Sequence, residues 1–397
     1  MRSRLLMLFN GVVGLTTLLF LFLHFSSPPT TSGLQSQSAQ SQFTQPDQYL
    51  AYVIYPSQTE GADANVKTMA FPLTTNKEID TAQSSKQLFS QPEPSDCQTD
   101  DLYGSPNGRY ILIQYNCHTT LFMQLLKREG ETAVAIPRWQ GYFLDWSPDG
   151  NQILVRDTSN NQIMLLDTNA AAKVSTTTAQ PSGKIVPLPF GTYDASFSPD
   201  GKSILFVTNR GLGLGSEFGT FTLSTEKAEI QQTFPDQIVA YPRWSPDGKQ
   251  LAYILMPDSN RAYTTGELWL ADITGKPLTL LAEDADAGHG YPPVWSPQGQ
   301  TITYIVRENP DSIQANYHPR ALHSNIYQVD VATAKTTPLT AFKEGLLFDI
   351  QWSADGERLA FTANDAIWTM IPGQDPVQVS AVGDDLARHP VWLPGNQ

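Results

Sequence analysis

The pentapeptide WSPDG occupies residues 146–150 and returns unchanged at residues 244–248. Variants of it stand elsewhere in the chain: FSPDG at 197–201, WSPQG at 295–299, WSADG at 352–356 and the shorter SPNG at 105–108. Proline presets φ at the first position of a turn, aspartate tolerates the next position, and glycine supplies the positive φ that closes the turn. Each copy therefore predicts a tight hairpin turn between two β-strands.

The six copies mark a structural repeat. Their serines, about 40 to 60 residues apart, are Ser105, Ser147, Ser198, Ser245, Ser296 and Ser353. An apolar-aromatic stretch precedes each phrase, an alternating stretch such as QILVRD or QLAYIL follows it, and two more strand-like stretches complete the unit. Four short strands per unit are typical of β-propeller blades, so the sequence predicts an all-β propeller of four-stranded antiparallel blades.

The number of blades depends on the two ends of the repeat region. Near the C-terminus, HPVWLPG at 389–395 resembles YPPVWSPQG at 291–299, and no further strands follow its Trp392. Residues 49–90 contain three apparent strands without a turn phrase. We expect these remnants to form one blade, with the C-terminal strand innermost, so that seven blades are closed by a clasp. Six blades remain the alternative.

The N-terminal segment differs in composition from the repeats. Residues 5–25 carry no formal charge, follow Arg2 and Arg4, and as a helix would reach about 30 Å, the thickness of a hydrocarbon core. They predict an uncleaved transmembrane anchor over 1–25, with a cleaved signal peptide as the alternative. Residues 26–46, rich in Ser, Gln and Pro, predict a flexible stalk, and 47–397 the propeller. The expected localisation is a membrane-anchored propeller outside the cytoplasm, in a bacterial envelope.

The repeated W-S-P-D-G phrase, placed after the innermost strand, resembles the TolB-type β-propeller repeat over about residues 100–396. The resemblance implies the fold but says little about function, since such propellers occur both as binding modules and beside catalytic domains. TolB has an N-terminal domain where this chain has its expected anchor and stalk, so the partners of TolB are not expected here. The repeat also resembles the propeller of prolyl-oligopeptidase-type enzymes, but the chain has no G-x-S-x-G motif, and we expect no such peptidase chemistry.

The chain has two cysteines, Cys97 and Cys117, on either side of the GSPNG stretch at 104–108. A hairpin turning within that stretch, with a bulge at Gly108, would bring them to neighbouring strands within disulfide reach. We predict a disulfide, and two buried free thiols are the alternative.

Several recurring residues have a purely structural explanation. The aromatic residue before each phrase is expected to pack between blades, at Trp146, Phe197, Trp244, Trp295, Trp352 and Trp392. Turn chemistry explains the aspartates of the phrase, which are Asp149, Asp200, Asp247 and Asp355. The acidic stretch EDADAGHG at 283–290 supplies only half of a calcium loop and is expected to be a surface loop. We therefore predict no metal and no cofactor.

The loops that enter each innermost strand share one face of a propeller with the loops between the second and third strands. On that face we expect four histidines, His289, His318, His323 and His389. Their simplest interpretation is unrelated surface residues. If three of them converged at the channel mouth they could bind a transition metal, which keeps a metal-dependent lyase or hydrolase as the alternative function.

The same loop-rich face is our candidate binding site, because loops carry function and Tyr, Trp and Arg dominate binding surfaces. The predicted binding residues are Arg138, Trp139, Tyr142, Tyr193, Tyr241, Arg243, His289, Tyr291, Tyr317, Arg320, Arg388 and His389. A net charge of −14 argues against nucleic acid as a partner. The sequence favours a non-catalytic module that binds an envelope or cell-surface protein or glycan and reaches the membrane only through its N-terminal helix, and it leaves catalysis open.

Overall fold

The structure is a computed structural model, and it describes residues 47–55, 65–74, 79, 84–92, 97–118, 120–130, 132–173, 181–258, 264–287, 291–315, 317–318, 321–380 and 386–395. These residues belong to one compact unit, Gln45–Gln397. Within the described ranges the chain forms strands β1 to β29 and a short helix, α1 (Thr168–Ala171).

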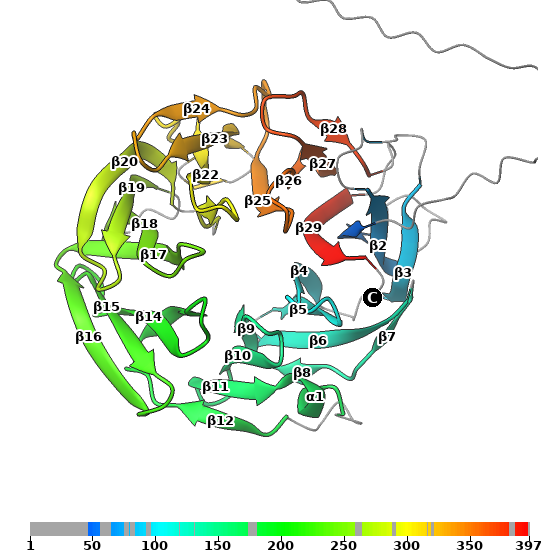
Figure 1. Cartoon of the computed structure of the whole chain (residues 1–397), viewed down its shortest axis with the longest axis horizontal. Helices are drawn as coiled ribbons and strands as arrows, with labels where there is room; N and C mark the ends of the chain where they lie inside the picture. The colour runs from blue at the N-terminus through cyan, green and yellow to red at the C-terminus, as the bar shows by residue number, and fades with distance from the viewer. Residues whose placement is uncertain are drawn as a thin grey trace, which may run out of the picture. The chain divides into compact units, whose positions relative to one another are not determined.

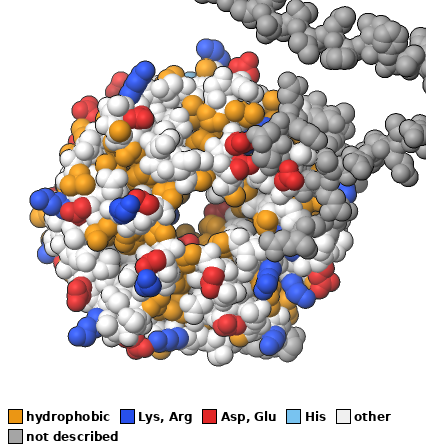
Figure 2. All heavy atoms as spheres, viewed as in Figure 1, with side chains coloured by type: hydrophobic (Ala, Val, Ile, Leu, Met, Phe, Trp, Pro, Cys, Tyr) orange, Lys and Arg blue, Asp and Glu red, His pale blue; other side chains and the backbone are white. Residues whose placement is uncertain are grey.

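The strands form seven four-stranded antiparallel blades. The blades are arranged in a ring (Figure 1), and the space-filling view shows an opening at its centre (Figure 2). Blade 1 contains β4 (Gln98–Gly104), β5 (Tyr110–Cys117), β6 (Thr120–Glu129) and β7 (Thr132–Ala135), and β8 (Trp139–Gln140) also pairs with β6. Blade 2 contains β9 (Tyr142–Trp146), β10 (Gln152–Asp157), β11 (Gln162–Asp167) and β12 (Gly183–Val186). Blade 3 contains β13 (Thr192–Phe197), β14 (Ser203–Asn209), β15 (Ser216–Thr222) and β16 (Lys227–Phe234). The lowest-numbered strand of each of these blades is the innermost one.

Blades 4 and 5 are joined into one longer sheet by the pairing of Ala285 with Val306. Blade 4 contains β17 (Gln237–Trp244), β18 (Gln250–Pro257), β19 (Thr265–Asp272) and β20 (Pro277–Asp286). Blade 5 contains β21 (Val294–Trp295), β22 (Thr301–Arg307), β23 (Ser324–Asp330) and β24 (Thr336–Pro338). Blade 6 contains β25 (Leu347–Trp352), β26 (Leu359–Ala363), β27 (Ala366–Met370) and β28 (Val377–Gln378). The predicted four-stranded antiparallel blades are thus confirmed.

Blade 7 combines the two ends of the described chain. Its strand order is β29 (Leu386–Pro394), β1 (Gln48–Tyr55), β2 (Asn65–Leu73) and β3 (Lys86–Pro92), and Leu50 pairs with Trp392. This pairing confirms the predicted clasp and gives seven blades rather than six. As a consequence, blade 7 brings the C-terminal strand between blades 6 and 1 (Figure 1).

Apolar packing between blades supplies the core. Val391 of blade 7 packs in one cluster with Ile111 of blade 1, and Leu50 packs in another with Ala360 of blade 6. The aromatic residue before each phrase also bridges blades: the Trp295 Nε1 donates to the carbonyl of Arg243 at 3.1 Å. A single four-stranded blade cannot bury both of its faces, and stacking neighbours around a ring buries them.

The repeated phrase is a hairpin turn, as predicted. In the copy at 146–150, the amide of Gly150 donates to the carbonyl of Ser147 at 2.8 Å, and Gly150 has φ of 67°. The Asp149 carboxylate accepts the Ser147 hydroxyl at 2.6 Å and the amide of Asn151 at 3.0 Å. The turn aspartates therefore have a structural role that their own hairpin explains.

Cys97 and Cys117 form a disulfide with an S–S distance of 2.00 Å. Cys97 precedes β4 and Cys117 ends β5, so the bond joins the two inner strands of blade 1, which confirms the predicted pairing.

The predicted N-terminal transmembrane helix is corrected. The described chain has no helix long and apolar enough to cross a membrane, and its α1, with four residues, spans only about 6 Å of the roughly 30 Å required. The expected anchor over 1–25 and stalk over 26–46 lie outside the described residues. The predicted localisation, a membrane-anchored propeller in a bacterial envelope, rested on that helix and is withdrawn with it.

Candidate functional site

The innermost strands of six blades carry a β-bulge or register shift near the channel mouth. The shifts lie in the pairings of β4, β9, β13, β17, β25 and β29 with their neighbours. A bulge leaves one residue unpaired and turns its side chain in a new direction. The bulges thus turn side chains from successive blades toward the channel.

Three bulge residues adopt positive φ although none is a glycine: Tyr241 (53°), Asp349 (55°) and His389 (59°). Such conformations are uncommon for residues with a side chain and persist where the surrounding structure holds them. Tyr241 and Asp349 stand four residues before the serine of their turn phrase, and His389 stands at the matching distance before Leu393. The position four residues before the serine of the turn phrase therefore places side chains from different blades around the channel, and we call this set the channel ring.

A cavity of about 410 Å³ lies at the channel. Its lining residues are Asp101, Leu102, Tyr103, Tyr142, Phe143, Leu144, Tyr193, Asp194, Asn209, Ile238, Ala240, Tyr241, Arg243, Met256, Tyr291, Pro292, Asp349, Ile350, Gln351 and Pro390. Figure 2 shows the opening at the centre of the ring, with hydrophobic and acidic side chains around it. Its volume falls in the usual range for small-molecule sites, roughly 300–1,000 Å³.

Five tyrosines from blades 1 to 5 form much of this lining. Tyr103 stacks on Phe143 with ring centroids 4.2 Å apart, and Tyr291 stacks on Phe348 at 5.4 Å. Tyr193 donates its hydroxyl hydrogen bond to the carbonyl of Val239. These contacts hold the rings of Tyr103, Tyr193 and Tyr291 in place, so this part of the cavity wall is preorganised.

The phenols of Tyr103, Tyr142, Tyr193 and Tyr291 stay protonated at neutral pH. Burial, followed by the nearby charge of Asp101, raises the pKa of Tyr142 to about 12. Burial also raises the pKa of Tyr103, Tyr193 and Tyr291 above their usual range. The cavity therefore presents aromatic rings and uncharged hydroxyl groups.

Blades 2 to 4 meet in a group of charged residues. Arg243 Nη1 lies 3.0 Å from Asp194 Oδ2. Burial lowers the pKa of Arg243, but the charges of Asp194 and Asp145 outweigh burial and raise that pKa overall. Asp145 accepts backbone hydrogen bonds from Phe197 at 2.8 Å and Trp146 at 2.9 Å. Burial nevertheless raises the pKa of Asp145 to about 7.

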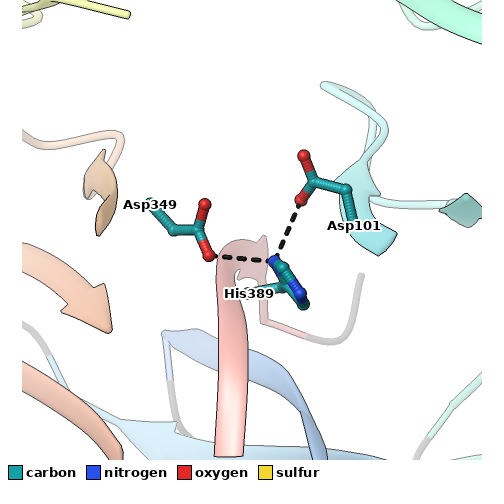
Figure 3. A group of neighbouring side chains, drawn as sticks. All are labelled: Asp101, Asp349 and His389. Atoms are coloured by element: carbon teal, nitrogen blue, oxygen red, sulfur yellow. Dashed lines mark ion pairs between the residues drawn. The ribbon is translucent and has the colours of Figure 1, made fainter. Parts of the chain in front are cut away.

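A second charged group joins blades 6, 7 and 1 (Figure 3). His389 Nδ1 lies 2.9 Å from Asp349 Oδ2 and 3.4 Å from Asp101 Oδ1. Burial would lower the pKa of His389, but Asp349 and then Asp101 outweigh it and raise that pKa to about 10. Burial raises the pKa of Asp349 in turn. Two carboxylates and one imidazole thus face each other beside the cavity.

The predicted binding residues divide by position. Tyr142, Tyr193, Tyr241, Arg243 and Tyr291 line the cavity, and His389 lies at its edge beside Asp101 and Asp349. The remaining described ones do not line it. His289 and Arg320 lie outside the described residues. The binding role of all these residues stays a prediction.

The other predicted binding residues have neighbours of their own. Arg388 lies over the rings of Tyr55 and Phe348 and its Nε donates to Asp365 at 2.8 Å. Three more are placed as follows: Trp139 is buried in the core of blade 1, Arg138 lies over the ring of Tyr115, and Tyr317 is 55% exposed.

The histidines expected to share a metal are not seen together. His318 is exposed, and His323 Nε2 contacts the carbonyl of Phe342 at 2.9 Å. Among the described residues, the groups that could hold a metal reduce to Asp101, Asp349 and His389. The acidic stretch expected as a surface loop is also different, because its residues 283–286 end strand β20.

Reasoning from the sequence missed Asp101, Asp194 and Asp349. The signal was present, because each stands four residues before the serine of its phrase, at Ser105, Ser198 and Ser353. Counting from the serine in this way would have placed all three on one ring with His389.

No protein-family model matches the chain. It is 25% identical over 202 residues to an uncharacterized peptidase, YuxL, of Bacillus subtilis strain 168, a match that covers 43% of this chain and 29% of that protein. It is 26% identical over 123 residues to dipeptidyl-peptidase 5 of Porphyromonas gingivalis, covering 30% of this chain and 17% of that one. These matches span less than a third of either relative, so they transfer no activity.

Solved structures resemble the chain over most of its length. TolB from Acinetobacter baumannii is 16% identical with a TM-score of 0.50, covering 87% of this chain and 67% of that one. An oligogalacturonate lyase in complex with manganese is 13% identical with a TM-score of 0.51 (85% and 86%), and a proposed 6-phosphogluconolactonase from Bacteroides fragilis is 13% identical with a TM-score of 0.55 (87% and 98%). These neighbours include enzymes as well as TolB, and likeness at this level shows the fold alone. The chain has a TolB-like β-propeller fold.

Proposed function

We propose that the propeller is a non-catalytic module that binds a glycan in the cavity at the channel. The observation that carries this proposal is the lining, which combines five tyrosines with polar groups such as Asp194, Asn209 and Gln351. A sugar ring has apolar C–H faces and hydroxyl groups at its edge. Rigid aromatic walls suit the faces, and carboxylates and amides suit the hydroxyl groups.

The electrostatics support a neutral or weakly cationic ligand. The cavity is lined by three carboxylates, those of Asp101, Asp194 and Asp349, and by the guanidinium of Arg243. His389 adds one more positive charge beside it, which leaves the group with a slight excess of negative charge. A strongly anionic chain would meet like charges here, since such repulsion is costly in a partly buried site.

The proposal is tested by screening the purified full chain against neutral, acidic and amino-sugar oligosaccharides, in buffer with EDTA. A hit is then titrated calorimetrically against wild type and Tyr142→Ala. We expect affinity to fall at least about tenfold, because aromatic residues at the centre of a site carry much of its binding energy. Tyr317→Ala is the matched control, as Tyr317 is exposed and does not line the cavity.

Two results would count against the proposal. One is the absence of saturable binding to any oligosaccharide of the panel. The other is an equal loss of affinity in the Tyr142→Ala and Tyr317→Ala variants, which would move the site out of the cavity. Binding of a panel of short peptides with higher affinity than any sugar would favour the protein partner instead.

A further inference from the structure

Three ligand atoms of the kind that bind metals converge from three blades. One oxygen each of Asp101 (β4) and Asp349 (β25) and a ring nitrogen of His389 (β29) all lie within 4.8 Å of one another. Figure 3 shows both carboxylates directed at the same nitrogen. Ligand atoms bound about 2.0–2.2 Å from one metal ion lie about 3–3.5 Å apart. The observed separations from His389 Nδ1, 2.9 and 3.4 Å, are close to this spacing.

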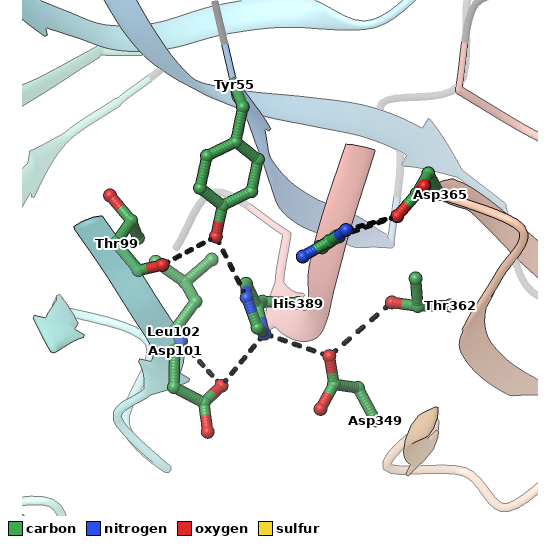
Figure 4. Close-up of polar contacts among 9 residues, drawn as sticks. Tyr55, Thr99, Asp101, Leu102, Asp349, Thr362, Asp365 and His389 are labelled. Atoms are coloured by element: carbon green, nitrogen blue, oxygen red, sulfur yellow. Dashed lines mark hydrogen bonds and ion pairs between the residues drawn. The ribbon is translucent and has the colours of Figure 1, made fainter. Parts of the chain in front are cut away.

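The hydrogen bonds of Tyr55 fix the orientation of the imidazole (Figure 4). The Tyr55 hydroxyl donates to the carbonyl of Thr99 at 2.9 Å and lies 3.0 Å from His389 Nε2. A carbonyl only accepts, so the single phenol proton goes to Thr99. The Nε2 of His389 must then be the donor to Tyr55. This arrangement leaves Nδ1 as the nitrogen that faces the two carboxylates, and a hydrogen bond at the far nitrogen is how proteins orient metal-binding histidines.

The Nδ1 atom forms ion pairs with both carboxylates but makes no hydrogen bond of good geometry with either. His389 is only 8% exposed, and Nδ1 is buried without a hydrogen bond of acceptable geometry. Without an ion, Nδ1 carries a proton whose charge the two carboxylates balance, so a metal ion would have to replace that proton. A cation placed among the three atoms satisfies Nδ1 and both carboxylates together.

We propose that Asp101, Asp349 and His389 bind a divalent transition-metal ion at the wall of the cavity. One imidazole with two carboxylates suits Zn²⁺ or Mn²⁺, whereas Ca²⁺ and Mg²⁺ prefer all-oxygen sites. Asp101 and Asp349 also line the cavity, so the ion has coordination positions open to it. Three protein ligands with an open position for water or substrate are typical of catalytic zinc sites, whereas structural sites are closed. A metal ion here would therefore favour the alternative function, a metal-dependent lyase or hydrolase.

The backbone supports a built site. Asp349 and His389 both hold positive φ in bulges, and Asp101 follows the bulge of β4. Asp101 Oδ1 is further positioned by the amide of Leu102 at 2.7 Å. Strained backbone that aims side chains at one point is found at ligand-binding sites more often than elsewhere. The inference does not depend on glycan binding, because it concerns the ion alone.

The experiment measures metal binding directly. The full chain is stripped with EDTA, dialysed against Zn²⁺ or Mn²⁺ alone, and analysed by elemental analysis and calorimetry. We expect one ion per chain with a dissociation constant in the micromolar range or below. Asp101→Asn and Asp349→Asn should each weaken binding at least about tenfold. Asp194→Asn is the matched control: it stands at the same register position in blade 3 and lines the cavity, but pairs with Arg243.

Circular dichroism of each variant shows whether it is folded before it is scored. The proposal is overturned if the wild-type chain binds less than one metal ion per chain at a metal concentration of about 1 mM. That concentration is on the order of a thousand times the expected dissociation constant, so a real site would be saturated. It is also overturned if Asp194→Asn lowers affinity as much as Asp349→Asn does. The glycan screen in EDTA is separate, so failure of one proposal leaves the other standing.

Discussion

Two rings of aspartates in the same blades are used in opposite ways. In blades 3 and 6 the chain places one aspartate in the channel ring and another six residues later in the turn phrase: Asp194 with Asp200, and Asp349 with Asp355. The turn carboxylates accept hydrogen bonds from residues two positions away, and those bonds lower the pKa of Asp200. The environment of Asp200 is therefore complete within one hairpin, whereas Asp355 also accepts a hydrogen bond from Gln48 of blade 7 at 2.6 Å.

The channel carboxylates find their partners in other blades. Asp194 pairs with Arg243 of blade 4, and Asp349 faces His389 of blade 7. Residues of the turn ring can be exchanged for other turn formers, since Asn107 and Gln298 already replace aspartate there. The difference teaches that the repeat builds each hairpin independently, whereas the site exists only when the ring is closed.

The largest effect is expected from breaking the channel ring at its one imidazole. His389→Ala leaves Asp101 and Asp349 facing each other without a positive charge, and removing one partner of a buried ion pair costs about 2–4 kcal/mol after allowance for partial exposure. Urea unfolding at pH 7 in EDTA measures this loss. The double variant His389→Ala with Asp349→Asn should recover part of it. A loss below about 1 kcal/mol in the single variant would contradict the comparison.

A smaller effect should appear as a pH dependence. The pKa of Asp145 is raised to about 7 in the folded chain, against about 3.9 when unfolded, so the folded state binds more protons between these values. Folding stability must then fall as pH rises from about 4 to about 7, with a decrease of about 1–3 kcal/mol between pH 5 and pH 8.

Urea unfolding at a series of pH values measures the slope. In Asp145→Asn the titration is absent and the curve should be flatter, although its overall stability drops, because one acceptor for the amides of Phe197 or Trp146 becomes a donor. The same slope in wild type and variant would assign the pH dependence to other groups.

The fold could be predicted from the sequence because its signals are local. Each turn phrase specifies one hairpin, and the degraded copy at Trp392 indicated the closing strand, which indeed pairs with Leu50. The clasp also makes blades 6, 7 and 1 neighbours. With the register of the repeat, that order already brings Asp349, His389 and Asp101 together.

What the sequence could not supply was the direction of the side chains. The bulge at His389 depends on the pairing of β29 with β1, which is distant in sequence, whereas those at Tyr241 and Asp349 lie within hairpins. Asp and His adopt positive φ more often than most residues, but residue type alone does not show where a bulge falls. Trp139 shows the same limit: a tryptophan in an expected surface loop pairs as β8 with Met123 and is buried. Residue type alone suggested that Trp139 binds a ligand, whereas the structure shows that Trp139 packs in the core.

The smallest effect is expected in the turn ring. Asp149→Ala removes the acceptor for the Ser147 hydroxyl and the Asn151 amide, and the loss of these exposed hydrogen bonds should cost about 0.5–1.5 kcal/mol in urea unfolding. Asp149→Asn is the control that the chain itself provides, because Asn107 accepts the Ser105 hydroxyl at 2.9 Å and the Arg109 amide at 3.1 Å in blade 1. We expect it to be nearly neutral.

Neither turn variant should alter metal binding at the channel, since the Asp149 carboxylate bonds only within its own hairpin. If Asp149→Ala lowered the metal affinity of the full chain as far as Asp349→Asn does, the two rings would be coupled through the blades. The separation between a local scaffold and a site made by ring closure would then fail, however small the change in stability.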